Sequence, residues 1–167
     1  MEQFRVEVAG ATLAGEQRGS GVPLVLIHGM GSCRAGWDRL LEHLPADLPL
    51  LRYDLRGFGA SVADPDAEYS HVDDLLALLD ARGIDRAVPC GLSLGGGVAT
   101  ALAVAAPERV ARLVLVSPAL HGWPWSAEWR GLWREAGMAA KEGDLARARD
   151  LWVAHPMFAA ARENPQA

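Results

Sequence analysis

The sequence predicts an α/β fold in which a mostly parallel sheet is covered by helices on both faces. Short apolar runs alternate with stretches whose apolar residues recur at helical spacing. The runs, 22–27 above all, are apolar throughout, as expected of parallel strands buried on both faces. Glycine-rich breaks at 29–31 and 91–97 follow two of them, at the carboxyl ends of strands where active sites of open sheets lie.

The first third of the chain is expected to hold an antiparallel hairpin, two further strands and a short helix. Alternation of apolar and polar residues indicates the hairpin strands, with a turn at Gly10. The expected elements are strands at 4–8, 13–17, 22–27 and 48–54 and a helix at about 36–44.

The next part repeats the strand–helix alternation twice. Ser70, with Asp73 three residues later, is typical of a helix N-cap, and Gly83 is expected to end that helix. Pro107 is expected to stop a second helix made of small residues. The expected elements are a loop at 56–61, strands at 86–90 and 112–116, and a helix at 94–105 after a sharp turn at 91–95.

Composition excludes several classes of protein. With 167 residues, 50% of them hydrophobic and 22% charged, the chain can form one globular domain. A net charge of −5 argues against nucleic acid or an anionic membrane surface as a partner. Charges scattered through the first 30 residues do not resemble a secretory signal, and no apolar run reaches the ~20 residues that span a bilayer. We expect a cytoplasmic protein.

Neither a cofactor nor a metal is expected. Cys33 and Cys90 have no metal-ligand or disulfide-framework spacing, and we interpret them as small buried apolar residues. No G-x-G-x-x-G motif and no P-loop follow a predicted strand.

The segment 91–95 reads G-x-S-x-G between a predicted strand and a predicted helix. That context indicates a nucleophile elbow, with Ser93 as nucleophile and with Gly91 and Gly95 leaving room for neighbouring backbone. The turn would hold Ser93 in a strained conformation and raise its hydroxyl above the sheet. The alternative is a small serine without a role in a glycine-rich turn.

A second loop, after the run 22–27, is expected to face Ser93. An acyl-transfer reaction needs hydrogen-bond donors aimed at its oxyanion, and we expect the backbone N–H groups of Met30 and Leu94 to supply them. His28 and Gly29 would support this loop. We expect His28 to orient the loop and not to act as the general base.

Three motifs in order resemble the α/β-hydrolase fold-1 family: LIHGMG at 26–31, YDLRGFGAS at 53–61 and CGLSLGG at 90–96. The family includes esterases, lactonases, metal-free haloperoxidases and C–C bond hydrolases. The resemblance covers about residues 5–117 strongly and implies a serine nucleophile at Ser93 with an oxyanion hole at Met30 and Leu94. It also implies that Asp54 anchors a loop, and a serine nucleophile argues against dehalogenase or epoxide hydrolase activity.

The sequence departs from the family pattern after Ser93. In this fold the acid and the histidine of the triad follow the serine in the chain, yet no carboxylate follows the strand 112–116, and only His121 and His155 come later. Both lie in the expected cap, so we do not expect either to be catalytic. We therefore expect a hydrolase core at 1–118, truncated after the sixth strand, and the start of a helical cap at 119–167.

Two consequences are expected of such a chain. Without an acid and a histidine, ester turnover should be near background. Without a seventh strand, the apolar residues 113–116 form an open edge that favours self-association or aggregation. A soluble monomer that melts cooperatively would count against this expectation.

Tryptophans crowd the expected cap. Two interpretations stay open: they pack the cap helices onto the sheet, or some of them line an apolar substrate pocket. The residues are Trp123, Trp125, Trp129, Trp133 and Trp152.

Three functions are compatible with these observations. The first is hydrolysis of a small carboxylic ester or lactone through an acyl-serine intermediate. The second is a non-catalytic binding module on the hydrolase fold, which the intact elbow and the intact Met30 loop disfavour. The third is one half of a split hydrolase whose partner supplies the acid and the histidine.

Overall fold

The structure is a computed structural model that describes residues 1–120 and 122–164. It divides into two compact units, residues 1–121 and 122–167, which are described separately. The strands of the first unit are β1 (Glu2–Val8), β2 (Ala11–Arg18), β3 (Leu24–Ile27), β4 (Leu50–Tyr53), β5 (Val62–Ala63), β6 (Val88–Leu92) and β7 (Val114–Val116). Its helices are η1 (Arg34–Trp37), α1 (Asp38–Leu41), α2 (His71–Ala81), α3 (Leu94–Ala105) and η2 (Pro107–Arg109).

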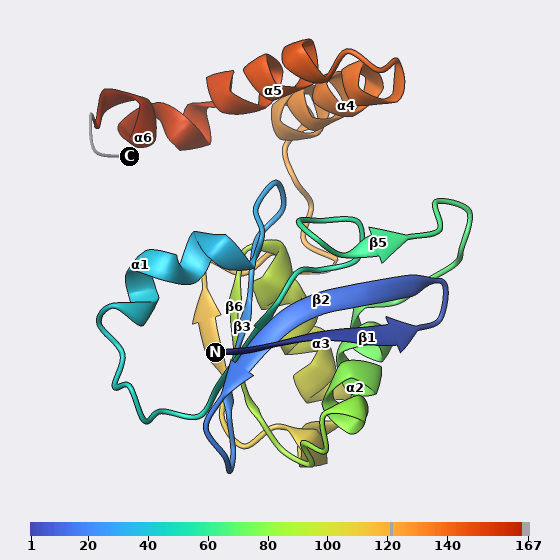
Figure 1. Ribbon diagram of the computed structural model, residues 1–167. Helices are drawn as coiled ribbons and strands as arrows, with labels where there is room; N and C mark the ends of the chain where they lie inside the picture. Colours follow the sequence, from blue (N-terminus) through green and yellow to red (C-terminus); the bar gives the residue numbers. More distant parts are fainter. Residues whose placement is uncertain (121, 165–167) are drawn as a thin grey trace. The chain divides into compact units, whose positions relative to one another are not determined.

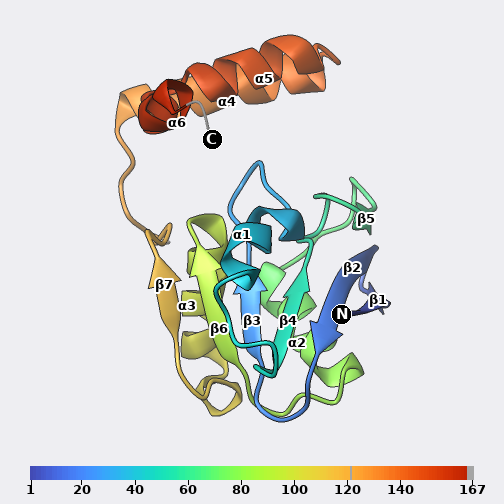
Figure 2. The same ribbon diagram turned by 60° about the vertical axis from the view of Figure 1, so that its left-hand side comes forward.

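The strands of the first unit form one mixed sheet. Along the sheet the order is β1-β2-β4-β3-β6-β7, and β5 pairs with β2 outside this path. The hairpin β1–β2 is antiparallel and β2 is antiparallel to β4, whereas β4, β3, β6 and β7 run parallel to one another. Figure 2 shows this order, with β7 at one edge beside β6. The predicted α/β class with a mostly parallel sheet is therefore confirmed.

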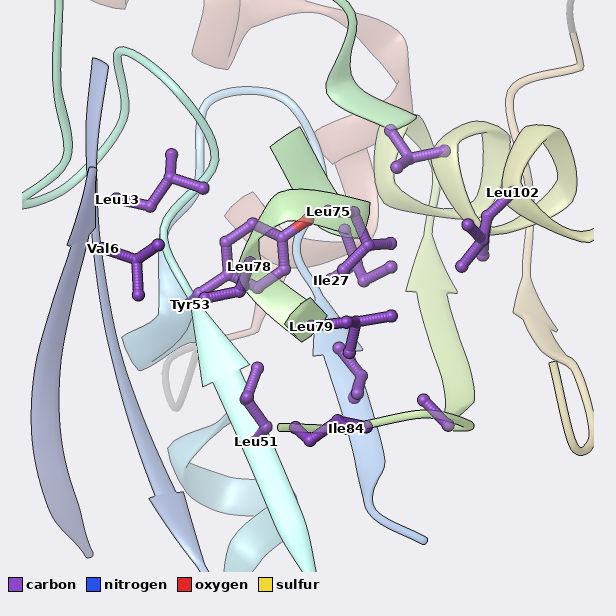
Figure 3. Close-up of a cluster of buried hydrophobic side chains, with 14 of the residues drawn as sticks. Val6, Leu13, Ile27, Leu51, Tyr53, Leu75, Leu78, Leu79, Ile84 and Leu102 are labelled. Atoms are coloured by element: carbon purple, nitrogen blue, oxygen red, sulfur yellow. The ribbon is translucent and has the colours of Figure 1, made fainter. Parts of the chain in front are cut away.

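Alternating side chains of the central strand β3 belong to two different apolar clusters. Val25 and Ile27 of β3 join the larger cluster with residues of α2 and α3, whereas Leu26, between them, joins a smaller cluster with Leu40 and Leu41 of α1. Successive residues of a strand point to opposite faces, so the two clusters lie on opposite faces of the sheet. Figure 1 shows α1 on one side and α2 and α3 on the other, and Figure 3 shows the larger cluster.

The first helix and β7 are among the elements that differ from their predicted lengths. The helix predicted at 36–44 is a 3₁₀ turn followed by four α-helical residues. The amides of His43 and Leu44 bond to carbonyls three residues back, a tight turn that precedes Pro45. The α-helical conformation is disfavoured before a proline, which explains the early end of the helix.

The second difference is at β7, which has three residues in place of the predicted five. Val110 pairs with Ala87, and Val114 pairs with Cys90. From Val110 to Val114 the chain therefore advances four residues, whereas from Ala87 to Cys90 it advances three. The extra residue interrupts the ladder in the manner of a β-bulge.

The second unit is helical. Its elements are α4 (Ala127–Lys141), α5 (Leu145–Ala154), η3 (Pro156–Phe158) and α6 (Ala159–Glu163). Gly143, with φ +83°, forms the turn between α4 and α5, and Asp144 caps α5 by accepting the amide of Arg147. Among residues 1–120 and 122–164, no helix has both the length and the apolar character needed to cross a membrane.

Four of the cap tryptophans contact one another inside this unit. Trp125 stacks on Trp129 with ring centroids 5.4 Å apart, and both lie beside Trp133. Trp133 in turn contacts Trp152 at 6.0 Å. The rings therefore form an aromatic chain that joins α4 to α5, an arrangement that neither interpretation of the sequence anticipated.

Candidate active site

Ser93 occupies a strained turn between β6 and α3. Its backbone has φ +50° and ψ −111°, a combination that L-residues rarely adopt. The residue is the N-cap of α3, but its side chain caps no helix amide. Because the hydroxyl is half-buried and not used for capping, it is free to face a substrate.

The glycines on either side of Ser93 are required by close backbone contacts. A β-carbon on Gly91 would collide with the carbonyl group of Gly95, and one on Gly95 would collide with the carbonyl groups of Ile27 and His28. The turn can therefore close against the end of β3 only where both positions lack side chains. This contact accounts for the G-x-S-x-G spacing in physical terms.

The loop after β3 lies beside the serine. A β-carbon on Gly29 would be 3.4 Å from the Cβ of Ser93, so the backbone at Gly29 and the serine side chain are neighbours. In the described part of the chain, the amide of Met30 donates to no backbone acceptor. Leu94 is the first residue of α3, where an amide has no partner within its own helix. The two predicted oxyanion donors thus have backbone N–H groups that are not used by the fold.

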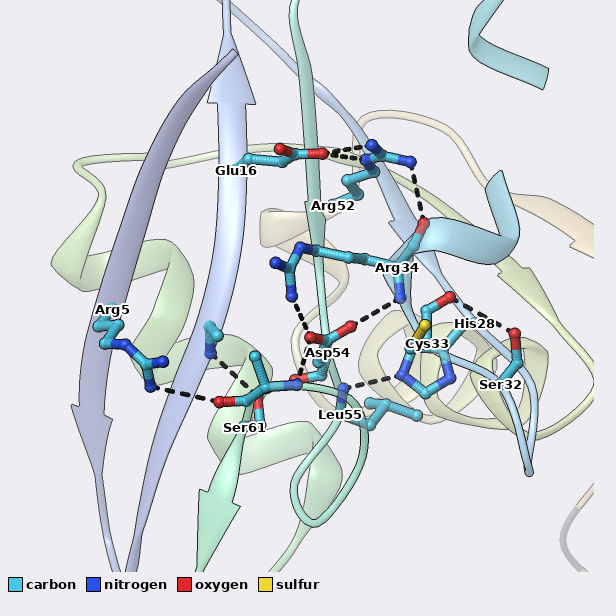
Figure 4. A network of polar contacts seen from close by, with 12 residues as sticks. Arg5, Glu16, His28, Ser32, Cys33, Arg34, Arg52, Asp54, Leu55 and Ser61 are labelled. Atoms are coloured by element: carbon cyan, nitrogen blue, oxygen red, sulfur yellow. Dashed lines mark hydrogen bonds and ion pairs between the residues drawn. The ribbon is translucent and has the colours of Figure 1, made fainter. Parts of the chain in front are cut away.

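His28 fixes the orientation of that loop. Its Nδ1 donates to the carbonyl oxygen of Gly29 at 2.8 Å. Its Nε2 accepts the backbone N–H of Leu55 at 3.0 Å, a bond that Figure 4 shows. Because Nε2 accepts, the ring is the neutral tautomer with its proton on Nδ1. Burial lowers the pKa of His28, which keeps the ring neutral. Both ring nitrogens are occupied, so this imidazole has no lone pair available to deprotonate Ser93.

The hydrogen bond from His28 has a direct effect on the Met30 amide. The carbonyl of Gly29 and the N–H of Met30 belong to one planar peptide group, in which they point in opposite directions. The carbonyl accepts from His28 and also from the amide of Ser32 at 3.3 Å. Holding this oxygen therefore sets the direction of the Met30 N–H.

Asp54 holds the loop that follows β4. Its buried carboxylate accepts the backbone amides of Arg34 at 2.7 Å and Ala60 at 2.9 Å, and it forms an ion pair with the Arg34 side chain. Figure 4 shows these contacts around the carboxylate. Through these contacts Asp54 anchors the loop 56–61 to η1.

Sequence reasoning did not single out three further ion pairs, which involve Arg56 and Arg52. Arg56 donates to both carboxylate oxygens of Asp74, at 2.6 Å and 2.9 Å, and this buried contact raises the pKa of Arg56. Arg52 pairs with Glu16 and Asp38. The members of each pair lie 14 to 36 residues apart in the sequence, so no local motif could have indicated them.

The described residues do not supply a general base for Ser93. Within residues 1–120 and 122–164, no side chain is hydrogen-bonded to the Ser93 hydroxyl. His155 is buried in the second unit, where its Nδ1 accepts the amide of Met157 at 3.1 Å and its ring contacts Trp129. His121 lies outside the described residues. The same described ranges contain no group of three or more histidine, cysteine, aspartate or glutamate residues suited to a metal ion.

Curated relatives are hydrolases and esterases. The chain is 38% identical over 141 residues to a 2-hydroxymuconate semialdehyde hydrolase of Pseudomonas sp. (strain CF600), covering 81% of this chain and 49% of the relative. It is 38% identical over 118 residues to a pimeloyl-[acyl-carrier protein] methyl ester esterase of Nitrosomonas europaea, covering 68% and 46%. The chain thus spans about half the length of the curated relatives it matches.

Solved structures of hydrolases share the fold. A hydrolase from Pseudomonas aeruginosa PA01 superposes with a TM-score of 0.78 at 31% identity, covering 98% of this chain and 63% of that one. A thermophilic esterase from Thermogutta terrifontis superposes with a TM-score of 0.70 at 31% identity, covering 86% and 55%. Residues 22–148 match the family described as alpha/beta hydrolase fold. The chain therefore belongs to the alpha/beta hydrolase family.

Proposed function

We propose that Ser93 is the nucleophile of a hydrolase that cleaves a carboxylic ester or a lactone through an acyl-serine intermediate. The observation that carries the proposal is the strained Ser93 backbone, which places the side chain against the Gly29–Met30 loop. Strained residues at a turn between a strand and a helix are typical of this kind of nucleophile. Relatives that are named as esterases support the substrate class.

In the proposed reaction, the Ser93 oxygen bonds to the substrate carbonyl carbon, and the carbonyl electron pair moves to oxygen. The backbone N–H groups of Met30 and Leu94 donate to this oxyanion. The partial positive charge at the start of α3 favours the same negative charge. Collapse of the intermediate breaks the ester bond, and the leaving oxygen takes up the proton lost by Ser93 and departs as an alcohol. Water then hydrolyses the acyl-serine to a carboxylic acid and the free Ser93 hydroxyl. In a lactone the alcohol stays attached to the acyl group.

Proton transfer is the step for which the described residues offer no group. A serine hydroxyl needs a base within hydrogen-bond reach, and the base needs a partner that holds its tautomer. We infer that the 167-residue chain by itself turns over esters at or near background. The base would have to come from residues that the structure does not place beside Ser93, whether in this chain or in another.

The proposal can be tested by supplying the missing base. The full 167-residue chain and its Ser93→Ala variant would be assayed with a p-nitrophenyl ester, with and without imidazole. Imidazole catalyses ester hydrolysis in free solution, so the difference between the two proteins is the quantity to compare. We expect this difference to be near zero without imidazole and to rise with imidazole concentration.

A covalent probe provides a second measurement of the same group. In the presence of imidazole as the base, a p-nitrophenyl alkylphosphonate should add one phosphonyl group, seen by intact-protein mass spectrometry and located at Ser93 by peptide mapping. Labelling that persists in Ser93→Ala, or the absence of any Ser93-dependent signal in both assays, would contradict the nucleophile assignment. Robust turnover without imidazole that disappears in Ser93→Ala would support the nucleophile but overturn the inferred lack of a base.

A further inference from the structure

Both backbone groups of Ser93 are hydrogen-bonded to the segment made of the last residue of β7 and the three residues after it. The amide of Ser93 donates to the carbonyl of Val116 at 3.0 Å, and the carbonyl of Ser93 accepts the amide of Ala119 at 2.8 Å. Residues 116–119, here called the clasp, therefore bridge the two sides of the strained residue. The carbonyl also accepts the amide of Gly97, a bond within the first turn of α3.

The clasp itself contains an unusual backbone conformation. Ser117 has φ +44°, and it shares a positive φ with only one other non-glycine residue of the described ranges, Ser93. The chain bends at Ser117, between the two residues that bond to the backbone of Ser93, Val116 and Ala119. The second strained residue therefore lies within the segment that is hydrogen-bonded to the first.

Two glycines outside the G-x-S-x-G motif make room for the clasp. A β-carbon on Gly96 would lie 2.8 Å from the Cα of Pro118, and one on Gly97 would collide with the carbonyl oxygen of Ala119. Both positions lie in α3, where glycine is a poor helix former, so the helix alone does not favour them. Contact with the clasp gives a physical reason for Gly96 and Gly97, whereas Gly95 is required by the backbone of Ile27 and His28.

We propose that the clasp is a positioning segment that keeps Ser93 in its strained, substrate-facing conformation. Strain of this kind persists only where surrounding contacts determine the conformation, and the clasp supplies the two backbone contacts that do not come from α3. The catalytic meaning of this inference rests on the proposed function, because it assumes that Ser93 is the nucleophile. The claim that the clasp holds the backbone conformation of Ser93 does not depend on that assumption.

Ser117 is suited to a test because its side chain is exposed. In Ser117→Val a β-branched residue disfavours positive φ without altering the core, whereas in Ser117→Gly the same backbone is freely allowed. The pair therefore changes the conformation of the clasp and little else. If the clasp holds Ser93, Ser117→Val should release it and Ser117→Gly should not.

A second pair of variants approaches the clasp from α3. In Gly97→Ala the new methyl group collides with Ala119, whereas in Gly137→Ala, within α4, the new methyl group meets nothing within 4 Å. Alanine is otherwise the better helix former at both positions. Loss of the clasp in the first variant only would therefore be due to the contact and not to helix propensity.

The first readout is nuclear magnetic resonance on the labelled 167-residue chain. The one-bond Cα–Hα coupling of Ser93 differs between positive and negative φ, and amide exchange of Ala119 reports its hydrogen bond. We expect Ser117→Val and Gly97→Ala to lose the positive-φ coupling and to exchange the Ala119 amide at least about tenfold faster, a loss of bonding that local opening produces. Ser117→Gly and Gly137→Ala should match the wild-type chain.

The second readout is the rate at which the phosphonate labels Ser93 in the presence of imidazole. Misplacing a reacting group by about 1 Å costs on the order of a hundredfold in rate, so we expect about tenfold to a hundredfold slower labelling in Ser117→Val, with the rate restored in Ser117→Gly. An unchanged Ser93 coupling in Ser117→Val, or equal losses in Ser117→Val and Ser117→Gly, would overturn the clasp. If the wild-type chain is never labelled, the proposed function fails, while the coupling still decides the clasp.

Discussion

Strands β3 and β7 are short apolar strands of one parallel sheet, yet solvent reaches them very differently. Val25, Leu26 and Ile27 of β3 have 0% of their surface exposed. The three residues of β7 are 39–41% exposed. β3 has a parallel neighbour on each side and packs into apolar clusters on both faces, whereas β7 pairs only with β6 among the described strands. Position in the sheet, and not residue type, sets the difference.

The functional groups depend on both strands in different ways. β3 carries the loop of His28 and Met30 and is held by buried side chains. β7 carries the clasp, which is held chiefly by hydrogen bonds to the backbone of Ser93. Ser93, the proposed nucleophile, therefore lies between a buried central strand and an edge strand with little burial of its own. Variants that act on one strand and not the other can measure this contrast.

The largest expected effect comes from truncating one leucine in each strand. Leu26→Ala should lower the free energy of unfolding by about 3 kcal/mol, because it removes a buried side chain and leaves a cavity. Leu115→Ala, at 39% exposure, should cost less than about 1 kcal/mol. Urea unfolding of both variants gives the comparison, and equal losses would show that the edge strand is buried in solution.

A smaller effect, with a size that depends on pH, is expected just after β3. His28→Ala should cost about 2 kcal/mol at pH 7, because the buried amide of Leu55 loses its acceptor. Burial lowers the pKa of His28 in the folded protein below its ordinary value of 6.5. The unfolded chain therefore binds the proton first, so the stability from neutral His28 is complete above about pH 6.5 and is lost as the pH falls through the lower folded pKa.

The measurement is urea unfolding at pH 7 and at pH 5. The wild-type chain should lose stability between these values, and His28→Ala should lose less, so the two should approach each other at pH 5. Burial also lowers the pKa of His71, which leaves a residual slope in the variant. A variant with the full wild-type slope would show that His28 is not the buried group that titrates.

The smallest effect on folding, but a clear one on association, is expected at the open edge. Leu115→Lys should change the free energy of unfolding by less than about 0.5 kcal/mol but reduce self-association, because charges on an edge strand oppose pairing with another chain. Sedimentation velocity over a range of concentrations measures this. Val104→Lys, at a 79% exposed position on α3, is the control and should associate like the wild-type chain. Equal behaviour of the two variants would remove β7 from the association surface.

Local signals in the sequence were sufficient for the fold class and for the sharp turn at Ser93 on which the candidate site is built. Ser93 and its flanking glycines lie within five positions of one another, and the conformation that they require depends mainly on neighbouring backbone. The length of β7 was overestimated, because an extra residue opposite β6 interrupts its ladder. Nothing in the apolar run itself could have indicated that residue.

Sequence by itself determined what depends on spacing along the chain: the alternation of strands and helices, the elbow at Ser93, and the loop that begins at His28. Only the tertiary structure decided which distant groups meet: His28 with Leu55, Arg56 with Asp74, and Ser93 with the clasp. It also decided that one apolar run is buried and another exposed. The physical reason is that backbone conformation is largely a local property, whereas burial and hydrogen-bond partners are set by the order of strands in the sheet.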